Sequence, residues 1–187
     1  DGKTAIISQG AEIAGNKGIL IVTSAGNYGS RGVSSITAPA DANGILSIGA
    51  VDVNLNRSSF SSRGPTVDGR IKPEVSTLGR SVSLITQAGI INTNGSGTSF
   101  SAPQIAALAA GLWQAKPELT KDELIEVLKA SGTQADNPDN LLGYGIPNFF
   151  RAFYGKILNV EDQQIENSSW KVYPNPNDGA ILYAEFG

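Results

Sequence analysis

Gly95-Ser96-Gly97-Thr98-Ser99-Phe100-Ser101-Ala102-Pro103 is the stretch on which the interpretation of the whole chain depends. It leads into a helical pattern with one apolar stripe at i, i+3, i+4 and i+7, formed by Ile105, Leu108, Ala109 and Leu112. Proline lacks an N–H and is tolerated near a first helical turn, so Pro103 places the start of the helix close to Ser99. We therefore expect a helix over residues 99–115 with Ser99 at its N-terminus.

A serine at a helix N-terminus has two different uses. Its side chain can cap the helix, which is the commonest role of serine there, and spacing alone favours this interpretation of Ser99. Its exposed hydroxyl can instead be a nucleophile, with free backbone N–H groups nearby to bind an oxyanion. A phosphate loop is excluded because no lysine precedes Thr98 and Ser99. The Gly-x-Ser-x-Gly pattern of α/β-hydrolases is also absent.

Two apolar runs upstream predict buried strands. Ile19-Leu20-Ile21-Val22 and residues 45–51 are continuously apolar or small, which is typical of strands in parallel sheets covered by helices. Three further helices are expected: one over residues 4–16, one that begins at Thr120, and a short one near residues 147–154. Thr120 and Glu123 form a capping box at the start of the second of these helices. The sequence therefore predicts an α/β fold: part of a three-layer structure with a parallel sheet and helices on both faces.

Composition excludes several classes of function. The chain has 187 residues, 40% of them hydrophobic, which suits a globular domain. Fourteen basic residues face seventeen acidic ones without a basic cluster, so nucleic acid is not an expected partner. No apolar run is long enough for a membrane span, and cysteine is absent. Histidine is absent too, so a histidine-dependent proton transfer would need a residue from outside this chain, and the usual zinc sites are excluded.

Four motifs, in order, resemble those of the subtilisin-like serine proteases. Gly97-Thr98-Ser99-Phe100-Ser101-Ala102-Pro103 resembles their nucleophile motif, and Ser24-Ala25-Gly26-Asn27 resembles the segment that carries the oxyanion-hole asparagine. Ile48-Gly49-Ala50-Val51-Asp52 and Phe60-Ser61-Ser62-Arg63-Gly64-Pro65 resemble two further runs of the family. The likeness covers roughly residues 1–154. It identifies the chain as similar to the C-terminal half of a subtilase catalytic domain.

The resemblance implies roles for individual residues. Ser99 would form an acyl-enzyme, and Asn27 would donate its side-chain N–H to the oxyanion together with the backbone N–H of Ser99. The substrate would bind as an extra strand, and the residues implied in binding it are Ser24, Ala25, Gly26, Tyr28, Gly29 and Thr98. Tyr28 and Arg31 would shape the primary specificity pocket. Without the resemblance, Asn27 is an ordinary turn residue and Thr98 a packing residue.

The sequence departs from the family in three places. The family's catalytic aspartate and histidine lie earlier in the chain, so we expect them on a missing N-terminal segment or on a second chain left by internal cleavage. Gln104 stands where many relatives have a histidine, and residues 74–79 replace a run ending in Ala-Pro-Gly, which predicts a differently shaped loop. No cofactor is expected. The resemblance allows a weak cation site between backbone carbonyls near residues 40–45 and Asp68, although a solvated turn aspartate is the simpler interpretation.

The chain changes character after residue 154. Residues 155–169 are polar and aperiodic, which predicts a linker, and residues 170–187 predict the beginning of a β-rich domain. Val172-Tyr173-Pro174-Asn175-Pro176-Asn177-Asp178-Gly179 resembles the opening of the C-terminal sorting domains of the type IX secretion system of Bacteroidetes-type bacteria. An ordinary proline and asparagine turn is the alternative.

The sequence thus predicts a secreted or cell-surface serine endopeptidase that acts on proteins or peptides, and this chain alone should be inactive without its base. Two other classes stay open. One is a peptide-binding module that holds a substrate-like strand without cleaving it. The other is a structural fragment whose open sheet edge is filled by its missing half.

Overall fold

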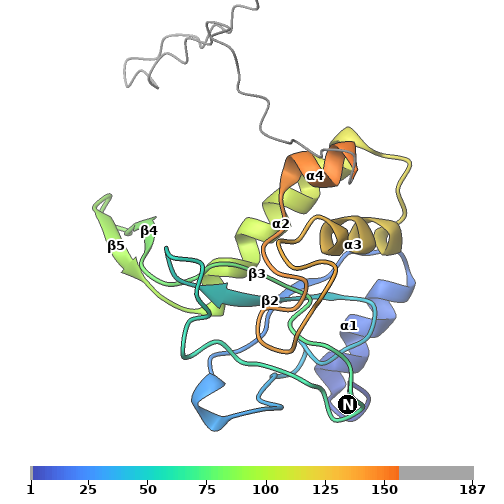
Figure 1. The fold of residues 1–187 in the computed structure, drawn as a ribbon, viewed down its shortest axis with the longest axis horizontal. Coiled ribbons are helices and arrows are strands. Elements are labelled where there is room, and N and C mark those ends of the chain that lie inside the picture. Colours follow the sequence, from blue (N-terminus) through green and yellow to red (C-terminus); the bar gives the residue numbers. More distant parts are fainter. Residues whose placement is uncertain (1, 156–187) are drawn as a thin grey trace, which may run out of the picture.

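A parallel sheet forms the centre of the molecule in the computed structural model, which describes residues 2–155. Its strands are β1 (Val22–Ser24), β2 (Leu46–Val51) and β3 (Val75–Leu78), hydrogen-bonded in that order (Figure 1). Every residue of β2 is buried, as its continuous apolar run predicted. This sheet and the helices packed on it confirm the predicted α/β fold.

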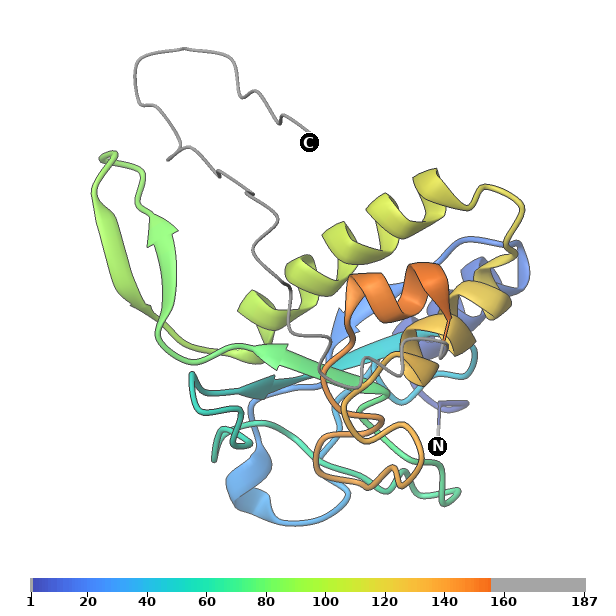
Figure 2. The same ribbon diagram turned by 45° about the horizontal axis from the view of Figure 1, so that its top comes forward.

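Three helices cover one face of this sheet. α2 (Thr98–Ala115) packs across all three strands, and α3 (Lys121–Ala130) and α4 (Phe149–Tyr154) lie beside it (Figure 2). The capping box predicted at Thr120 is present at the start of α3. The core between α2, α3 and the sheet is made of aliphatic side chains: Leu46, Ile48, Val75, Ile105, Leu112, Leu124 and Leu128. None of the helices among residues 2–155 is both long enough and apolar enough to cross a bilayer.

The first helix, α1 (Ile6–Asn16), packs through its small residues. Ser8 is buried and donates a hydrogen bond from Oγ to Asp41 at 2.6 Å, and a Cβ at Gly15 would lie 3.3 Å from the carbonyl oxygen of Gly44. Its isoleucines face outward instead, with Ile6 84% and Ile13 58% exposed. In the described part of the chain, the apolar side of α1 therefore has no partner.

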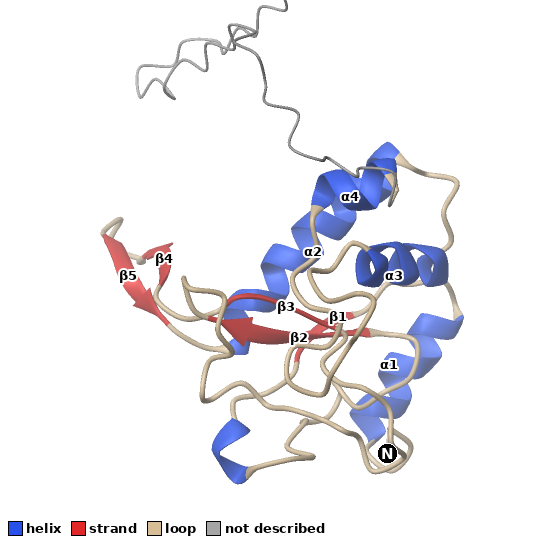
Figure 3. Ribbon diagram, viewed as in Figure 1, coloured by secondary structure: helices blue, strands red, loops and turns tan. Residues whose placement is uncertain are grey.

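The sequence analysis missed β3 and the hairpin that follows it. β4 (Val82–Ile85) pairs antiparallel with β5 (Ile91–Gly95), and the hairpin projects from the body of the molecule and leads directly to α2 (Figure 3). The expected loop over residues 74–79 is largely strand β3. The backbone N–H of Ser76 donates to Gly145 O at 2.9 Å, so the outer edge of β3 is covered by a loop. Among residues 2–155, no strand pairs with the outer edge of β1.

Candidate active site

Ser99 lies in the first turn of α2 and is exposed. The helix begins at Thr98, its N-cap is Gly97, and no side chain of the N-cap residue bonds to the helix. The interpretation of Ser99 as the helix cap is therefore wrong, because Ser99 stands one residue inside the helix. Its hydroxyl is free of the hydrogen bond that a cap makes, and its backbone N–H belongs to the first turn, where no helical acceptor exists.

Asn27 is oriented by Thr98. The Oδ1 atom of Asn27 accepts the backbone N–H of Thr98 at 2.9 Å and the hydroxyl of Thr98 at 3.0 Å. The Thr98 hydroxyl oxygen in turn accepts the backbone N–H of Gly26 at 3.2 Å. Because Oδ1 is occupied twice, the side-chain amide has one orientation, and Nδ2 is the end left to donate to another molecule.

Ser99 and Asn27 border one small space above Gly97. A Cβ atom placed on Gly97 would lie 3.1 Å from Ser99 Oγ and 3.3 Å from Asn27 Nδ2. Gly97 has a φ of 152°, a conformation that glycine adopts without cost, and its missing side chain keeps the space open. A nucleophilic oxygen and an amide donor therefore face the same point, which is the arrangement that acyl transfer needs.

The sheet holds both groups in place. Asn27 follows the carboxyl end of β1, where the Ala25 N–H donates to Ile48 O of β2 at 2.9 Å. The loop before α2 is tied to the carboxyl end of β3, because the Gly97 N–H donates to Gly79 O at 2.8 Å. A Cβ at Gly79 would come within 2.2 Å of Ser101 Oγ, so only glycine fits there. The site thus lies at the carboxyl ends of parallel strands, where α/β proteins generally bind ligands.

The structure brings together part of the set implied in substrate binding. Gly26 and Thr98 contact the site directly, whereas Ser24 is the last residue of β1 and Ala25 follows it toward the site. Tyr28 is exposed and lies under the guanidinium of Arg31, which is 4.1 Å from the ring centroid. Gly29 is buried, and a Cβ there would lie 2.3 Å from Ser61 O, so packing against residues 59–61 accounts for the glycine at that position.

Two positioning residues escaped the sequence analysis. Thr37 Oγ1 lies 2.5 Å from where a Cβ at Gly26 would be, and its backbone N–H donates to Ala25 O at 3.1 Å. Gly79 holds the loop before Ser99, as described above. Neither carries a sequence signal of its own, because both act through contacts between distant segments.

At the predicted cation site, the guanidinium of Arg70 contacts the expected oxygen atoms. Its Nε donates to both carboxylate oxygens of Asp68 at 3.0 and 3.1 Å, while its other nitrogens donate to the carbonyl oxygens of Asp41 at 2.7 Å and Ala42 at 3.1 Å. Arg70, with help from Thr66, holds the pKa of Asp68 well below its ordinary value. Among residues 2–155, no group of three or more histidine, cysteine or acidic side chains gathers to hold a metal.

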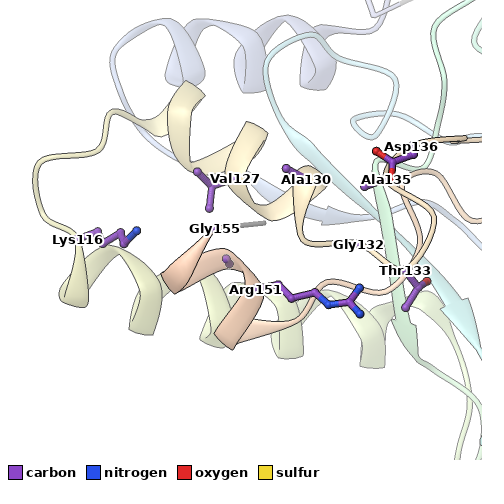
Figure 4. Close-up of a pocket in the computed structure, with 10 residues that line it drawn as sticks. Lys116, Val127, Ala130, Gly132, Thr133, Ala135, Asp136, Arg151 and Gly155 are labelled. Atoms are coloured by element: carbon purple, nitrogen blue, oxygen red, sulfur yellow. The ribbon is translucent and has the colours of Figure 1, made fainter. Parts of the chain in front are cut away.

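A pocket of about 410 Å³ lies away from the site, between α3, α4 and the end of α2 (Figure 4). Lys116, Val127 and Arg151 are among the residues that line it. Lys116 follows the last residue of α2, and a helix rises about 1.5 Å per residue, so the pocket is roughly 25 Å from Ser99. It shares no residue with the Ser99 and Asn27 site.

Comparison with known proteins agrees with this fold. The model of the subtilase family matches residues 2–145, and the chain therefore belongs to the subtilase family. Over 159 residues it is 33% identical to Serine protease AprX of Bacillus subtilis (strain 168), an overlap covering 73% of this chain and 36% of that protein. Over 162 residues it is 35% identical to Subtilisin DY of Bacillus licheniformis, covering 86% of this chain and 52% of that protein.

A solved structure shows the same fold. The self-cleaved protease domain of PatA superposes with a TM-score of 0.66 at 23% identity, over 82% of this chain and 56% of that one. The chain therefore spans about a third to a half of the length of the two curated relatives above, and little more than half of this solved domain.

Proposed function

We propose that the full-length protein is a serine endopeptidase with Ser99 as its nucleophile. One observation carries this proposal: Ser99 Oγ and Asn27 Nδ2 border the same space above Gly97. The hydroxyl oxygen would attack the carbonyl carbon of a peptide bond, and the resulting oxyanion would accept the Asn27 amide and the Ser99 backbone N–H. The carbon–nitrogen bond then breaks, the amine leaves with the proton, and water hydrolyses the acyl-enzyme.

This reaction needs a base that the chain does not contain. A serine hydroxyl is a weak nucleophile until a neighbouring group accepts its proton, and none of the 187 residues is histidine. We infer that the aspartate and histidine of the family come from outside this chain, on the N-terminal half of the same catalytic domain or on a second chain. Residues 2–155 would then supply the nucleophile and oxyanion donors, and the other half the proton transfer.

The surface of the described residues supports a missing half. The outer edge of β1 has no strand beside it, and an unpaired sheet edge is a template for another strand. Close to it in sequence, Ile6, Ile7, Ile13 and Ile19 are each more than half exposed. Burying one such side chain is worth about 1.5–3 kcal/mol, so a covering segment would gain several times that amount. The curated relatives and the PatA domain are also longer than this chain.

The substrate and the place of action follow from the same proposal. An extended peptide would add as a strand beside Ser24–Gly26, with its scissile carbonyl over Gly97. The protein would act outside the cytoplasm or at the cell surface, carried there through a sorting domain that begins near residue 170. The linker over residues 156–169 and the motif of residues 172–179 lie outside the described residues, and for them the proposal depends on the sequence motif alone.

Labelling with a fluorophosphonate tests the proposal. The full-length protein should react at Ser99, whereas chain 1–187 alone should react far more slowly because it lacks a base. Ser99→Ala should abolish labelling. Ser96→Ala is the matched control, since Ser96 is exposed in the same loop but turned to the hairpin, where it accepts the Ser81 N–H at 3.2 Å.

The alternative is a peptide-binding module that has lost catalysis. A folded full-length protein that never labels, or one whose Ser99→Ala variant labels as well as the parent, would contradict the endopeptidase. Peptide binding without labelling would then favour the module.

A further inference from the structure

A second, smaller pocket opens beside Asn27. It has a volume of about 220 Å³ and is lined by Tyr28, Arg31 and residues 33–37. A water molecule takes about 30 Å³ of liquid, so this pocket has room for a side chain of four or five heavy atoms. It is open to solvent on the side of Tyr28 and Arg31, both of which are exposed.

The wall of this pocket is joined to the nucleophile by a short chain of contacts. Thr37 lines the pocket, and its Oγ1 atom lies 2.5 Å from the point where a Cβ atom on Gly26 would be. The Gly26 N–H donates to the hydroxyl of Thr98, and Thr98 precedes Ser99. On its other side, the pocket begins at Tyr28, the residue after Asn27. The pocket therefore lies next to Gly26 and Asn27, beside the space above Gly97 in which the proposed substrate carbonyl would lie.

The charge on the lining of the pocket is positive. Arg31 is its only charged lining residue, and Ser34 adds an exposed hydroxyl group. The hydroxyls of Ser35 and Thr37 already donate within the protein, to Arg63 O at 3.5 Å and to Ala25 O at 3.3 Å. The guanidinium carbon of Arg31 lies 4.1 Å from the centroid of the Tyr28 ring, and the side chain is exposed, so its N–H groups can reach a ligand. No carboxylate among residues 2–155 forms an ion pair with Arg31.

Arg63 is joined to the wall of the pocket through Ser35, and Arg57 lies near Arg63. The backbone carbonyl of Arg63 accepts the Ser35 N–H at 2.9 Å, and the Arg63 Nε is buried without a hydrogen-bond partner. Burial lowers the pKa of Arg57, and the nearby charge of Arg63 lowers it further, so these two cations are close together. The charged group joined to the pocket wall through Ser35 is therefore a cation, as Arg31 is.

We propose that this pocket selects substrates with an acidic side chain on the residue that carries the scissile carbonyl, and that Arg31 is the residue that recognises it. The planar guanidinium binds a carboxylate through two parallel N–H donors, and the ring of Tyr28 holds it in place for that contact. Residues 33–37 form the wall against which the rest of the side chain would lie. This inference rests on the proposed endopeptidase activity and adds its substrate class.

Cleavage of a matched peptide series by the full-length protein tests it. The peptides differ only at the residue before the scissile bond, which is Glu, Gln, Ala, Lys or Phe. The parent should cleave the Glu peptide with the highest kcat/KM. Arg31→Glu should lower that value about tenfold or more, the factor expected for a lost hydrogen bond to a charged group, and should raise cleavage of the Lys peptide. The Ala peptide should change little.

Arg151→Glu is the control, because it makes the same charge change on α4, at the other end of the molecule (Figure 1). Cleavage of all five peptides at similar rates, a preference for Phe, or an Arg31→Glu variant with an unchanged profile would overturn the specificity while leaving the endopeptidase intact. Absence of both fluorophosphonate labelling and peptide cleavage in the folded protein would overturn both.

Discussion

Thr98→Val removes a hydroxyl that orients Asn27, the proposed oxyanion donor, without changing the shape of the side chain. The Thr98 hydroxyl donates to Asn27 Oδ1 at 3.0 Å and accepts the Gly26 N–H at 3.2 Å. Valine places a methyl group where the hydroxyl stood. The Thr98 backbone N–H still donates to Oδ1, so Asn27 keeps one of its two bonds and is held more loosely.

The size of the effect follows from the bond that is lost. A neutral hydrogen bond contributes about 0.5–1.5 kcal/mol net, so kcat should fall about three- to tenfold, with little change in KM. Removing an oxyanion donor outright costs about 10²–10³ in kcat in a subtilisin. Thr98→Val should therefore be milder than Asn27→Ala. Thr98 is only 1% exposed, and the Gly26 N–H loses its acceptor, so unfolding should become easier by about 1–2 kcal/mol.

Steady-state kinetics of the full-length protein with Thr98→Val and Thr98→Ser separates orientation from packing. Serine keeps the hydroxyl and loses the methyl group, so Thr98→Ser should retain a kcat within about threefold of the parent if the hydrogen bond is what matters. The reasoning is refuted if Thr98→Val leaves kcat unchanged, or if both variants lose activity equally.

Two further changes test the space above Gly97 and the contacts of Arg70. Gly97→Ala should abolish fluorophosphonate labelling of a folded protein, because the added methyl group would lie 3.1 Å from Ser99 Oγ and 3.3 Å from Asn27 Nδ2. Gly89→Ala is the control for backbone strain, because Gly89 has a φ of 74° and no atom lies near its missing Cβ. This control variant should label normally. Arg70→Ala should lower the melting temperature at neutral pH, and millimolar Ca²⁺ should partly restore it if the freed oxygen atoms can hold a cation. Arg70 lowers the pKa of Asp68, so its contribution is complete above the ordinary carboxylate pKa and is lost as pH falls through the lowered one. The difference between variant and parent in thermal melts should accordingly shrink in acid, and a difference that grows in acid would contradict this.

Elements with strong local signals could be predicted from the sequence. α2 follows its apolar stripe, β2 follows its continuous apolar run, and α3 begins at its capping box. The hairpin had no such signal. β4 alternates over only four residues and β5 is exposed except at Gly95, so the backbone ladder between them, and not burial, defines both strands.

The start of α2 was misassigned for a different physical reason. Preference for serine at the N-cap is a local rule, and here a distant residue takes over the function of the cap. Asn27, 71 residues earlier in the chain, accepts the N–H of the first helical residue, Thr98. With that donor satisfied by Asn27, which follows β1, Gly97 can be the N-cap, and Ser99 lies in the helix with its hydroxyl free. Only the fold brings these two segments together, so no local pattern could have revealed it.

The contact between Asn27 and Thr98 also separates the two requirements of the proposed reaction, which are stabilisation of the oxyanion and activation of Ser99. Stabilising an oxyanion needs hydrogen-bond donors that are fixed in advance. Asn27, Thr98 and the first turn of α2 are held by hydrogen bonds among residues 26, 27 and 98. The ends of β1 and β3 hold the same segments in place. Activating Ser99 needs a base, and no bond of this group depends on one. The donors would therefore keep their geometry whether or not the proposed N-terminal half is bound. Assembly of the two halves would then supply proton transfer to a site whose electrostatic part already exists, so activity would depend on docking at the open edge of β1 and not on rearrangement around Ser99.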